Sequence, residues 1–493
     1  MISLKLSDEE EIRLEKLKKI RAAGINPYPA KAERTHKINE ALDEFDGLEK
    51  KKKNITIVGR VRSVRAHGAL TFAHLEDESG KIQLALKRDE VGAEKYTEFQ
   101  DFIDIGDFLE VHGAPFLTHK GEKTVLVKDF ALLSKSLTPL PEKWHGLTDV
   151  EIRYRKRHVD LISNPEVRQI FERRSLIIKA LREFFDSREF IEVETPILQP
   201  IPGGANARPF VTHHNALDID MYLRIAPELY LKRLIVGGME RVYEIARCFR
   251  NEGIDHLHNP EFTQIEFYQA YADYEDLMKL TEELLPYLAK KVLGETKCVY
   301  DKNEIDFAAP YPRITFREAI KKYAKIDIED FPTREALAKK AKALGVEIEK
   351  TDSHGRIMDE IYKKFVRPNL IQPTFIINHP LELSPLAKKM PGNPKYVERF
   401  QLVLAGGNEL CNAFSELNDP LDQEERFASQ EKARKAGDIE AQRMDTDFID
   451  ALRTGMPPTA GFGMGIDRLA MIFTNSHSAK EVILFPTLKP ESK

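Results

Sequence analysis

The chain has 493 residues, 42% hydrophobic and 31% charged, which excludes a disordered chain and predicts about three domains at ordinary domain sizes. Its 75 lysine and arginine and 80 aspartate and glutamate residues give a net charge of −5. This balance excludes a uniformly basic nucleic-acid coat but allows a local basic surface.

The cysteines and the apolar runs indicate the compartment. Cys248, Cys298 and Cys411 are odd in number and far apart, so they form no disulfide framework, and we expect the reducing cytoplasm. The N-terminal segment is acidic and lacks the apolar core of a signal peptide. No apolar run is long enough to span a bilayer, so we expect no membrane partner.

Residues 1–50 are predicted to form a helical extension. Ser7 and Glu10 make a capping box at its start, and Gly24 with Pro27 ends the helix. A narrow apolar stripe predicts a solvated helix that docks by this stripe. The alternative is that its basic side chains contact nucleic-acid phosphates.

Residues 51–140 are predicted to form a small all-β barrel. Runs typical of strands cover 55–64, 69–75, 81–87, 107–116 and 123–133, with a helical stretch at about 93–103. Three strands, a helix and two strands is the order of an OB-fold, which binds oligonucleotides on one face. The pattern alone also allows another small barrel.

A proline-marked linker at 141–152 separates this barrel from a larger domain at 153–493. Asn164 and Pro165 open a long helix, an N-cap residue followed by proline in the first turn. Helices and strands then alternate irregularly to the end. The lysine-rich segment at about 314–372 has no special site residues and is predicted to be a helical insertion.

Three blocks of the larger domain stand out. They are Phe190–Leu198 with Gly203–Phe210, Arg247–Gly253 with His258–Phe262, and Gly461–Arg468. Each block alone is compatible with an ordinary strand end, a solvated loop or a glycine turn before a helix. Together and in this order they resemble the three signature motifs of class II aminoacyl-tRNA synthetases.

Shorter strings narrow this resemblance to class II (subclass IIb) lysyl-tRNA synthetases. They are RNEG at 250–253, HNPEF at 258–262, APEL at 226–229, SELND at 415–419 and PPTAG at 457–461. The resemblance runs from about residue 10 to the end of the chain. It implies an α+β fold: an antiparallel-sheet catalytic domain with an N-terminal OB-fold that binds the anticodon. It also implies a homodimer whose interface includes the motif-1 region around Pro196.

The activity implied is lysine activation by ATP, giving lysyl-adenylate and pyrophosphate, followed by transfer of lysine to the 3′ end of tRNA(Lys). The attacking carboxylate and the α-phosphate are both anionic, so the site must supply fixed positive charge, and no general base is needed. By resemblance Arg250 bridges the two groups, a bidentate task that suits guanidinium. Arg468 and His258 match contacts at the γ-phosphate end.

The resemblance also assigns the remaining ATP contacts. Phe262 stacks on adenine, Glu252 accepts from its exocyclic amine, and Asn259 and Glu409 belong to the same ATP site. Mg²⁺ is implied as cofactor, about one to three ions, bridging phosphate oxygens to carboxylates. Glu409 matches one metal ligand. A second family carboxylate aligns with Gln401, and Leu257 replaces a frequent arginine, so the metal count and one phosphate contact depart from the family pattern.

Strand alternation predicts the amino-acid pocket. Side chains two apart share a face of a strand, so Phe262, Gln264, Glu266 and Tyr268 should line one side. By the same rule Asn412, Phe414 and Glu416 should share a face of a second strand. Glu266 and Glu416 would then point into one cavity beside the Tyr268 hydroxyl, which is what an ammonium group with three donors requires.

The remaining contacts come from the resemblance. Glu228 and the Gly204 backbone match contacts to the substrate α-amino group, and Asn412 matches a carboxylate contact. In the barrel, Arg65, Phe72 and Gln83 match the residues that read the central uridine of the anticodon, and Glu122 matches a weaker contact. Stacking and edge hydrogen bonds are the usual way to read unstacked RNA bases.

Two other functions remain open from the sequence. One is a paralogue that attaches lysine to a protein; such paralogues resemble the catalytic domain alone, and the intact barrel argues against it. The other is an inactive tRNA-binding module, which would be expected to lose motif arginines or pocket acids. Arg250, Arg468, Glu266 and Glu416 are all present.

Overall fold

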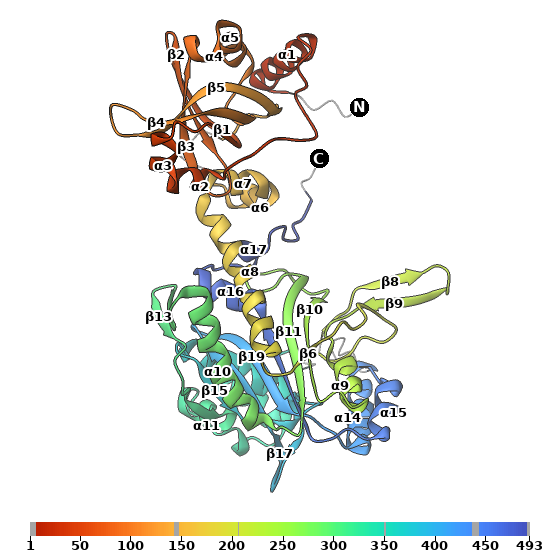
Figure 1. Ribbon diagram of the computed structural model, residues 1–493. Helices are drawn as coiled ribbons and strands as arrows, with labels where there is room; N and C mark the ends of the chain where they lie inside the picture. The colour runs from red at the N-terminus through yellow and green to blue at the C-terminus, as the bar shows by residue number, and fades with distance from the viewer. Residues whose placement is uncertain (1–5, 142–146, 206, 350–351, 436–442, 491–493) are drawn as a thin grey trace. The chain divides into compact units, whose positions relative to one another are not determined.

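The computed structural model describes residues 6–141, 147–205, 207–349, 352–435 and 443–490. It divides into two compact units, Met1–Thr148 and Asp149–Lys493 (Figure 1). Residues 142–146 of the expected linker and Asn206 of the first motif lie outside the described residues. Among the described residues, none of the helices is long and apolar enough to cross a membrane.

The first unit is a closed five-stranded barrel with the strand order β1-β2-β3-β5-β4. Its strands are β1 (Ile55–His67), β2 (Leu70–Glu76), β3 (Lys81–Lys87), β4 (Phe108–Leu117) and β5 (Lys123–Ser134). Its helices are α1 (Asp8–Ala22), α2 (Ile38–Asp43), α3 (Phe45–Lys50), α4 (Arg88–Val91) and α5 (Ala93–Phe102). Along β2 the side chains of Thr71, Ala73 and Leu75 are buried inside the barrel, because successive side chains of a strand point to opposite faces.

Helix α1 docks on this barrel as the apolar stripe predicts. The Ser7–Glu10 capping box is present, and Leu17 and Ile20 are buried. The sequence did not indicate the role of Arg13, whose buried guanidinium donates to the carbonyls of Ile105 (3.1 Å) and Ser136 (3.2 Å).

The second unit is built on an eight-stranded sheet with the order β14-β15-β18-β19-β20-β11-β10-β6. The pairs are antiparallel except β14–β15 and β10–β6 at the two edges. The strands are β6 (Ile191–Glu192), β10 (Arg241–Phe249), β11 (Glu261–Ala270), β14 (Arg313–Thr315), β15 (Thr374–Ile377), β18 (Arg399–Leu404), β19 (Asn408–Ser415) and β20 (Thr459–Gly465). The expected α+β class, an antiparallel-sheet domain with an all-β barrel, is confirmed.

One face of this sheet is apolar and carries the main core. Phe267, Phe400 and Phe462 pack there with α8 (Pro165–Asp186), α10 (Tyr274–Leu293) and α16 (Ile466–Thr474). The opposite face carries polar side chains in register: Gln401 pairs with Asn412, Asn412 with Gly463, Gly463 with Glu266, and Glu266 with Glu244. Because directly paired residues of a sheet share a face, this row brings segments distant in sequence to one surface.

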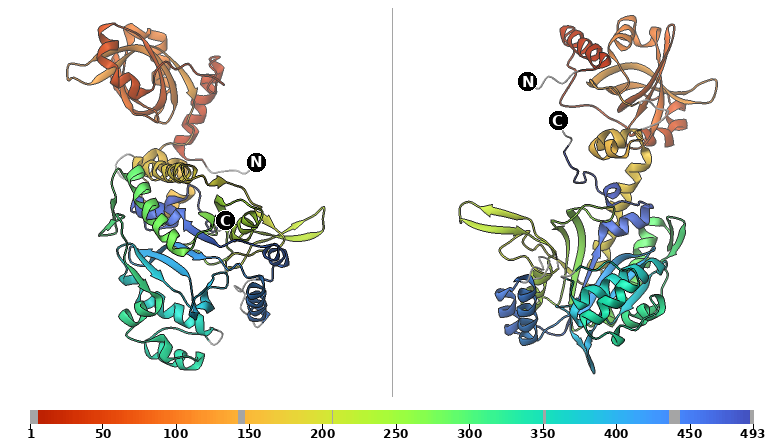
Figure 2. Two further views of the ribbon diagram at one scale, coloured as in Figure 1. Left: turned by 60° about the horizontal axis from the view of Figure 1, so that its bottom comes forward. Right: turned by 180° about the vertical axis from the view of Figure 1, so that it is seen from behind.

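The remaining elements surround the sheet. The helices are α6 (Val150–Arg155), α7 (Arg157–Ser163), α9 (Glu228–Val236), α11 (Phe316–Tyr323), η1 (Ile328–Asp330), α12 (Arg334–Ala343), α13 (His354–Phe365), η2 (Arg367–Asn369), η3 (Leu381–Leu383), α14 (Pro420–Lys435), α15 (Thr446–Thr454) and α17 (Ala479–Val482). The short strands are β7 (Leu198–Gln199), β8 (Val211–His214), β9 (Ile219–Leu223), β12 (Lys297–Tyr300), β13 (Asn303–Asp306), β16 (Lys389–Met390) and β17 (Asn393–Val397). The β8–β9 hairpin projects from the body of the second unit (Figure 2).

The segment expected as a helical insertion begins within the sheet. Strand β14 pairs in parallel with β15, and the helices α11 to α13 follow it. These helices have a small core of their own, which includes Ile376 and Val403 of the sheet. The segment is therefore anchored to the sheet through β14 and β15, the strands that flank it.

Candidate active site

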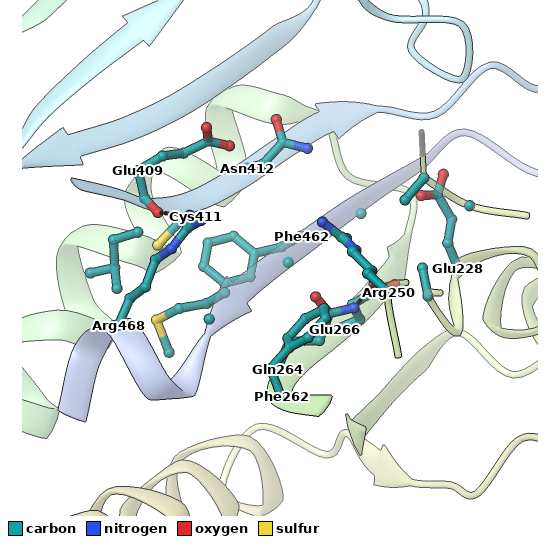
Figure 3. A pocket seen from close by; sticks show the side chains of 18 of the residues that line it. Glu228, Arg250, Phe262, Gln264, Glu266, Glu409, Cys411, Asn412, Phe462 and Arg468 are labelled. Atoms are coloured by element: carbon teal, nitrogen blue, oxygen red, sulfur yellow. Dashed lines mark hydrogen bonds between the residues drawn. The ribbon is translucent and has the colours of Figure 1, made fainter. Parts of the chain in front are cut away.

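A cavity of about 370 Å³ lies over the polar face of β11, β19 and β20. Figure 3 shows Arg468 and Glu409 at one end of it, Glu228 at the other, and Arg250 between them. The other expected residues that line it are Gly204, Glu252, His258, Asn259, Phe262, Glu266, Tyr268, Asn412 and Phe414. Segments about 260 residues apart in the chain thus meet in one cavity, as the resemblance implies.

Arg250 lies in the middle of the cavity and has one hydrogen-bond donor without a partner among the described residues. Its backbone N–H bonds to the Pro260 carbonyl (2.9 Å), which closes the loop between β10 and β11. Its guanidinium lies 5.0 Å from the centre of the Phe262 ring. Among the described residues its buried Nε has no hydrogen-bond partner. A buried N–H donor without a hydrogen bond costs free energy, so this group is suited to binding an anionic ligand.

Arg468 and His258 form a cationic end. Arg468 Nη1 donates to the Glu409 carbonyl (2.6 Å), and its Nη2 lies 3.3 Å from His258 Nε2. The other His258 nitrogen lies 2.9 Å from Asp255 Oδ2. Asp255 orients the imidazole, a role that the sequence did not indicate. Leu257, where the resemblance led us to expect an arginine, packs against the main core and supplies no cation.

Two other expected ATP residues differ in how they are placed. Glu252 is exposed at the rim of the cavity. Asn259 is buried; its Nδ2 donates to the Glu261 carbonyl (2.6 Å) and its Oδ1 accepts from the Thr487 N–H (3.2 Å). The Asn259 side chain therefore fixes the chain around the cavity.

Strand β11 supplies the side chains at the acidic end of the cavity. Glu266 is buried, and it accepts from Gln264 Nε2 (2.6 Å) and from the Tyr268 hydroxyl (3.2 Å). Burial, together with the charge of Glu228, raises the pKa of Glu266 to about 8. As strand alternation predicts, Phe262, Gln264, Glu266 and Tyr268 all line the cavity.

Glu416 has a partner that the expected arrangement does not include. It is fully buried and is not among the residues that line the cavity. One carboxylate oxygen pairs with Lys232 Nζ, and the other has no hydrogen-bond partner among the described residues. In the structure Lys232, one helical turn after Glu228, holds the Glu416 carboxylate, and the expected place of Glu416 in the cavity beside Glu266 stays a prediction.

Lys232 is a site residue that sequence reasoning missed. Its side chain is fully buried, and its Nζ also donates to Glu228 Oε1 (2.6 Å). Burial lowers the pKa of this amine, but the charges of Glu228 and Glu416 more than offset that effect and raise it. The only possible signal was the i,i+4 spacing of Glu228 and Lys232 on α9, which is common on helix surfaces.

Asn412 is oriented by a second residue that the sequence did not indicate. Arg399 Nε donates to Asn412 Oδ1 (2.8 Å), while its Nη1 donates to the Leu383 carbonyl and to Ser384 Oγ (both 2.8 Å). Arg399 lines the cavity. It fixes which way the Asn412 amide faces and adds a positive charge to this wall.

Gly204 brings the backbone close to Glu228. Its φ of +85° is one that side-chain-bearing residues rarely adopt, and an added Cβ would lie 2.9 Å from Glu228 Cβ. The close approach of the first motif to α9 therefore requires glycine at this position.

Of the two expected metal ligands, Glu409 and Gln401, only Glu409 lines the cavity. Glu409 lines the cavity beside Arg468, and a carboxylate there fits the preference of Mg²⁺ for hard oxygen ligands. Gln401 does not line it; its Oε1 accepts from the buried Tyr362 hydroxyl (3.1 Å). Because Gln401 does not line the cavity that Glu409 lines, the structure disagrees with a metal-ligand role for Gln401.

The expected anticodon residues share the outer face of the barrel. Arg65 lies directly opposite Phe72 on β1 and β2, and His74 lies opposite Gln83 on β2 and β3. Gln83 Nε2 donates to Glu122 Oε2 (2.7 Å). Phe72 alternates with buried barrel residues and is half-exposed, so it is not a core residue. An exposed cation, an aromatic ring and an amide suit an unstacked RNA base.

Comparison with known proteins agrees with this geometry. The family described as tRNA synthetases class II (D, K and N) matches residues 149–489, and the family of OB-fold nucleic acid binding domains matches residues 55–133. Similar proteins named lysine--tRNA ligase occur in Pelotomaculum thermopropionicum (53% identical, covering 98% of this chain and 96% of the relative), Moorella thermoacetica (52%, 99% and 100%) and Clostridium novyi (54%, 97% and 94%). The chain therefore belongs to the class II tRNA synthetases of the D, K and N group, and along nearly its whole length it is similar to lysine–tRNA ligases.

Proposed function

We propose that this chain is a lysine–tRNA ligase. It activates L-lysine with ATP to lysyl-adenylate, releases pyrophosphate and transfers the lysyl group to the 3′ end of tRNA(Lys). The observation that carries the proposal is the polarity of the cavity: guanidinium groups line its middle and one end, and buried carboxylates line the other. ATP requires the cationic part and the two ammonium groups of lysine require the acidic part.

Arg250 is proposed to hold the lysine carboxylate against the α-phosphate of ATP. Both groups are anions, so their approach must be offset by fixed positive charge that costs no reorganisation during the reaction. The unpartnered Nε of Arg250 supports this assignment, because this donor atom is already buried and the side chain lies in the cavity. The attacking carboxylate is ionised, so positioning replaces general-base catalysis.

The cationic end is proposed to take the departing pyrophosphate. Arg468 and His258 would contact the γ-phosphate end of ATP, with Asp255 keeping the imidazole oriented. Phe262 would stack on adenine, Glu252 would accept from its amine, and Asn259 shapes the wall of the site. Mg²⁺, about one to three ions, would be held by Glu409 and by phosphate oxygens and would reduce the phosphate charge when bound.

The acidic end is proposed to select lysine. Glu266 and the Tyr268 hydroxyl would receive the ε-ammonium, while Glu228 and the Gly204 backbone would receive the α-amino group. Asn412 would contact the carboxylate, and Phe414 would pack along the aliphatic stem. A neutral side chain would leave Glu266 unpaired, and sites built around such a hydrogen bond reject analogues that lack it by about 10⁴–10⁵.

The barrel is proposed to read the anticodon of tRNA(Lys). Arg65, Phe72, Gln83 and Glu122 would contact its bases, with the ring of Phe72 providing a stacking surface. This face is the main argument against a protein-lysylating paralogue. Since the site is expected to serve translation, we place the enzyme in the cytoplasm.

A homodimer is proposed through the first motif. Large apolar side chains are exposed along β6 to β9, among them Ile191, Leu198 and Val211. Such a patch marks an interaction surface, and a second copy fits the symmetry of most soluble oligomers. Leu198→Glu should convert the dimer to a monomer in sedimentation velocity; a wild-type chain that sediments as a monomer at micromolar concentration would refute the proposal.

ATP–pyrophosphate exchange with each of the twenty amino acids tests the main proposal. We expect lysine to be the best substrate by a wide margin. A better substrate than lysine would refute the specificity, and absence of exchange with every amino acid would favour the inactive tRNA-binding module.

Arg250→Ala tests the proposed chemistry. Removing one preorganised charge from a transition state costs about 10²–10³ in rate, so exchange should fall by at least that factor. The control is Arg188→Ala, a half-buried arginine that does not line the cavity and whose Nη2 pairs with Glu283 (2.8 Å). Exchange retained by Arg250→Ala would contradict its assignment.

A further inference from the structure

Lys232 joins the two carboxylates on which the proposed lysine site depends. Its Nζ bonds to Glu228 Oε1 at 2.6 Å and pairs with Glu416 Oε2, and all three side chains are buried. The amine also lies over three aromatic rings, at 5.5 Å from Phe414, 5.7 Å from Phe448 and 6.0 Å from Tyr268. Carboxylates and aromatic faces are the groups that bind an ammonium ion.

Lys232 is not among the residues that line the cavity, whereas Glu228, Tyr268 and Phe414 are. It therefore supports the wall from behind, and its ammonium is held where solvent does not reach. A buried carboxylate without a partner takes up a proton instead of staying ionised. Burial raises the pKa of Glu228 and of Glu416, and the Lys232 charge offsets only part of that rise.

Lys232 is the cation that contacts the carboxylate cluster directly, whereas Arg399 on the cavity wall bonds to Asn412. Glu228, Glu266 and Glu416 carry three negative charges when ionised, and Lys232 carries one positive charge. The remaining two negative charges match the α- and ε-ammonium groups of lysine, while Arg250 matches its carboxylate. An amino acid with a neutral side chain leaves the buried Glu266 without an ammonium partner, so this carboxyl either stays protonated or is ionised and unpaired, and neither form gains the contact that lysine makes.

We propose that Lys232 is a positioning and specificity-determining residue: a resident counter-ion that holds the Glu228 and Glu416 carboxylates in place, so that the pocket accepts an amino acid with two ammonium groups. This inference rests on the proposed lysine activation. Lys232 touches neither substrate; it acts through Glu228, the proposed acceptor of the α-amino group, and through the wall that Glu416 and Tyr268 build.

The strand behind Glu416 supports a fixed role for this pair. A Cβ added at Gly461 would overlap both Glu416 Oε1 and the Tyr268 ring. The carboxylate is thus packed against bare backbone on one side and held by Lys232 on the other. Glycine at position 461 therefore leaves the space that the Glu416 carboxylate occupies beside the Tyr268 ring.

Lys232→Met removes the charge and keeps most of the volume. In ATP–pyrophosphate exchange we expect the lysine KM to rise at least about tenfold, because truncating one partner of a buried charge pair costs that much or more. The ATP KM should stay within about twofold of wild type. Lys232→Arg keeps the charge and should raise the lysine KM less. A role in folding alone would lower Tm without separating the two KM values.

Lys135→Met is the matched control. Lys135 is also fully buried and also bridges two carboxylates, Asp104 (2.5 Å) and Asp107 (2.8 Å), but in the barrel unit. Its loss should lower the stability of the barrel and leave the lysine KM of exchange unchanged.

A double variant keeps the test decisive if Lys232→Met does not fold. Lys232→Met with Glu416→Gln removes both charges of the pair and restores the balance, so its lysine KM should lie below that of Glu416→Gln alone. Wild-type exchange with lysine reports separately on the proposed function. The inference is overturned if the lysine KM of folded Lys232→Met is unchanged or lower, if both KM values rise together, or if the double variant is worse than Glu416→Gln.

Discussion

At the scale of single residues, the acidic pocket combines groups that the chain brings from distant segments. Glu266 accepts from Tyr268 and Gln264 on its own strand, whereas Glu228 and Glu416 meet through Lys232. Strand periodicity predicts the first set, because alternation is local. It does not predict the second, because a charge four residues along a helix is as often solvated as buried.

The pKa of Glu266, about 8 in the free protein, predicts that lysine binding depends on pH. Below pH 8 this carboxyl carries a proton, and the ammonium groups of lysine favour its ionised form. Binding therefore releases a proton, so lysine affinity should rise as pH increases from about 6 to 8 and then level off, since lysine stays doubly cationic up to about pH 9.

Calorimetry at pH 7 in buffers of different ionisation enthalpy measures this proton directly. Glu266→Gln should bind lysine more weakly and should lose the proton release. Equal binding enthalpies in all buffers for the wild type would show that Glu266 is ionised before lysine arrives.

At the scale of elements, the glycines of β20 leave room for side chains from the neighbouring strands. Gly461 pairs with Tyr268 on one side and with Phe414 on the other, and Gly463 pairs with Glu266 and Asn412. Glycine weakens a strand and persists where another group approaches closely. Here those groups are the Glu416 carboxylate and the Tyr268 ring at Gly461.

Gly461→Ala should therefore raise the lysine KM by about tenfold or more, since forcing extra volume into a packed site costs about 1–3 kcal/mol. The matched variant is Gly463→Ala, whose Cβ would lie 3.7 Å from Glu266 Cγ in ordinary contact. Its effect on the lysine KM should be clearly smaller. Equal effects would mean that the space behind Tyr268 is not as tightly filled as the contacts indicate.

At the scale of the whole molecule, the two units carry two recognition tasks. The cavity for ATP and lysine lies in Asp149–Lys493, and the proposed anticodon face lies in Met1–Thr148. Amino-acid activation needs only the first task, whereas charging of tRNA needs both.

Phe72→Ala should consequently weaken tRNA charging while leaving pyrophosphate exchange within about twofold of wild type. Loss of a stacking ring costs about 1–3 kcal/mol per base, so charging at low tRNA concentration should fall by about five- to 150-fold. Tyr28→Ala, which removes an exposed aromatic side chain elsewhere in the same unit, is the control. Parallel loss of exchange and charging by Phe72→Ala would show that Phe72 is structural.

The sequence by itself determined the elements and the chemical types of the site. The Ser7–Glu10 capping box, the barrel strands, and the alternation through Phe262, Glu266 and Tyr268 depend on interactions between residues close in the chain. The motif strings supplied the family and the cavity residues that those strings contain.

Only the tertiary structure decided which charges meet. The pairing of Lys232 with Glu416, of Arg399 with Asn412, and of Tyr362 with Gln401 depends on packing between segments that the sequence leaves unrelated. These contacts give the Glu416 carboxylate a buried ammonium partner and the Gln401 carbonyl a buried hydroxyl partner. The physical reason is that a buried charge or carbonyl must find a partner, and the partner is chosen by what folding brings within reach.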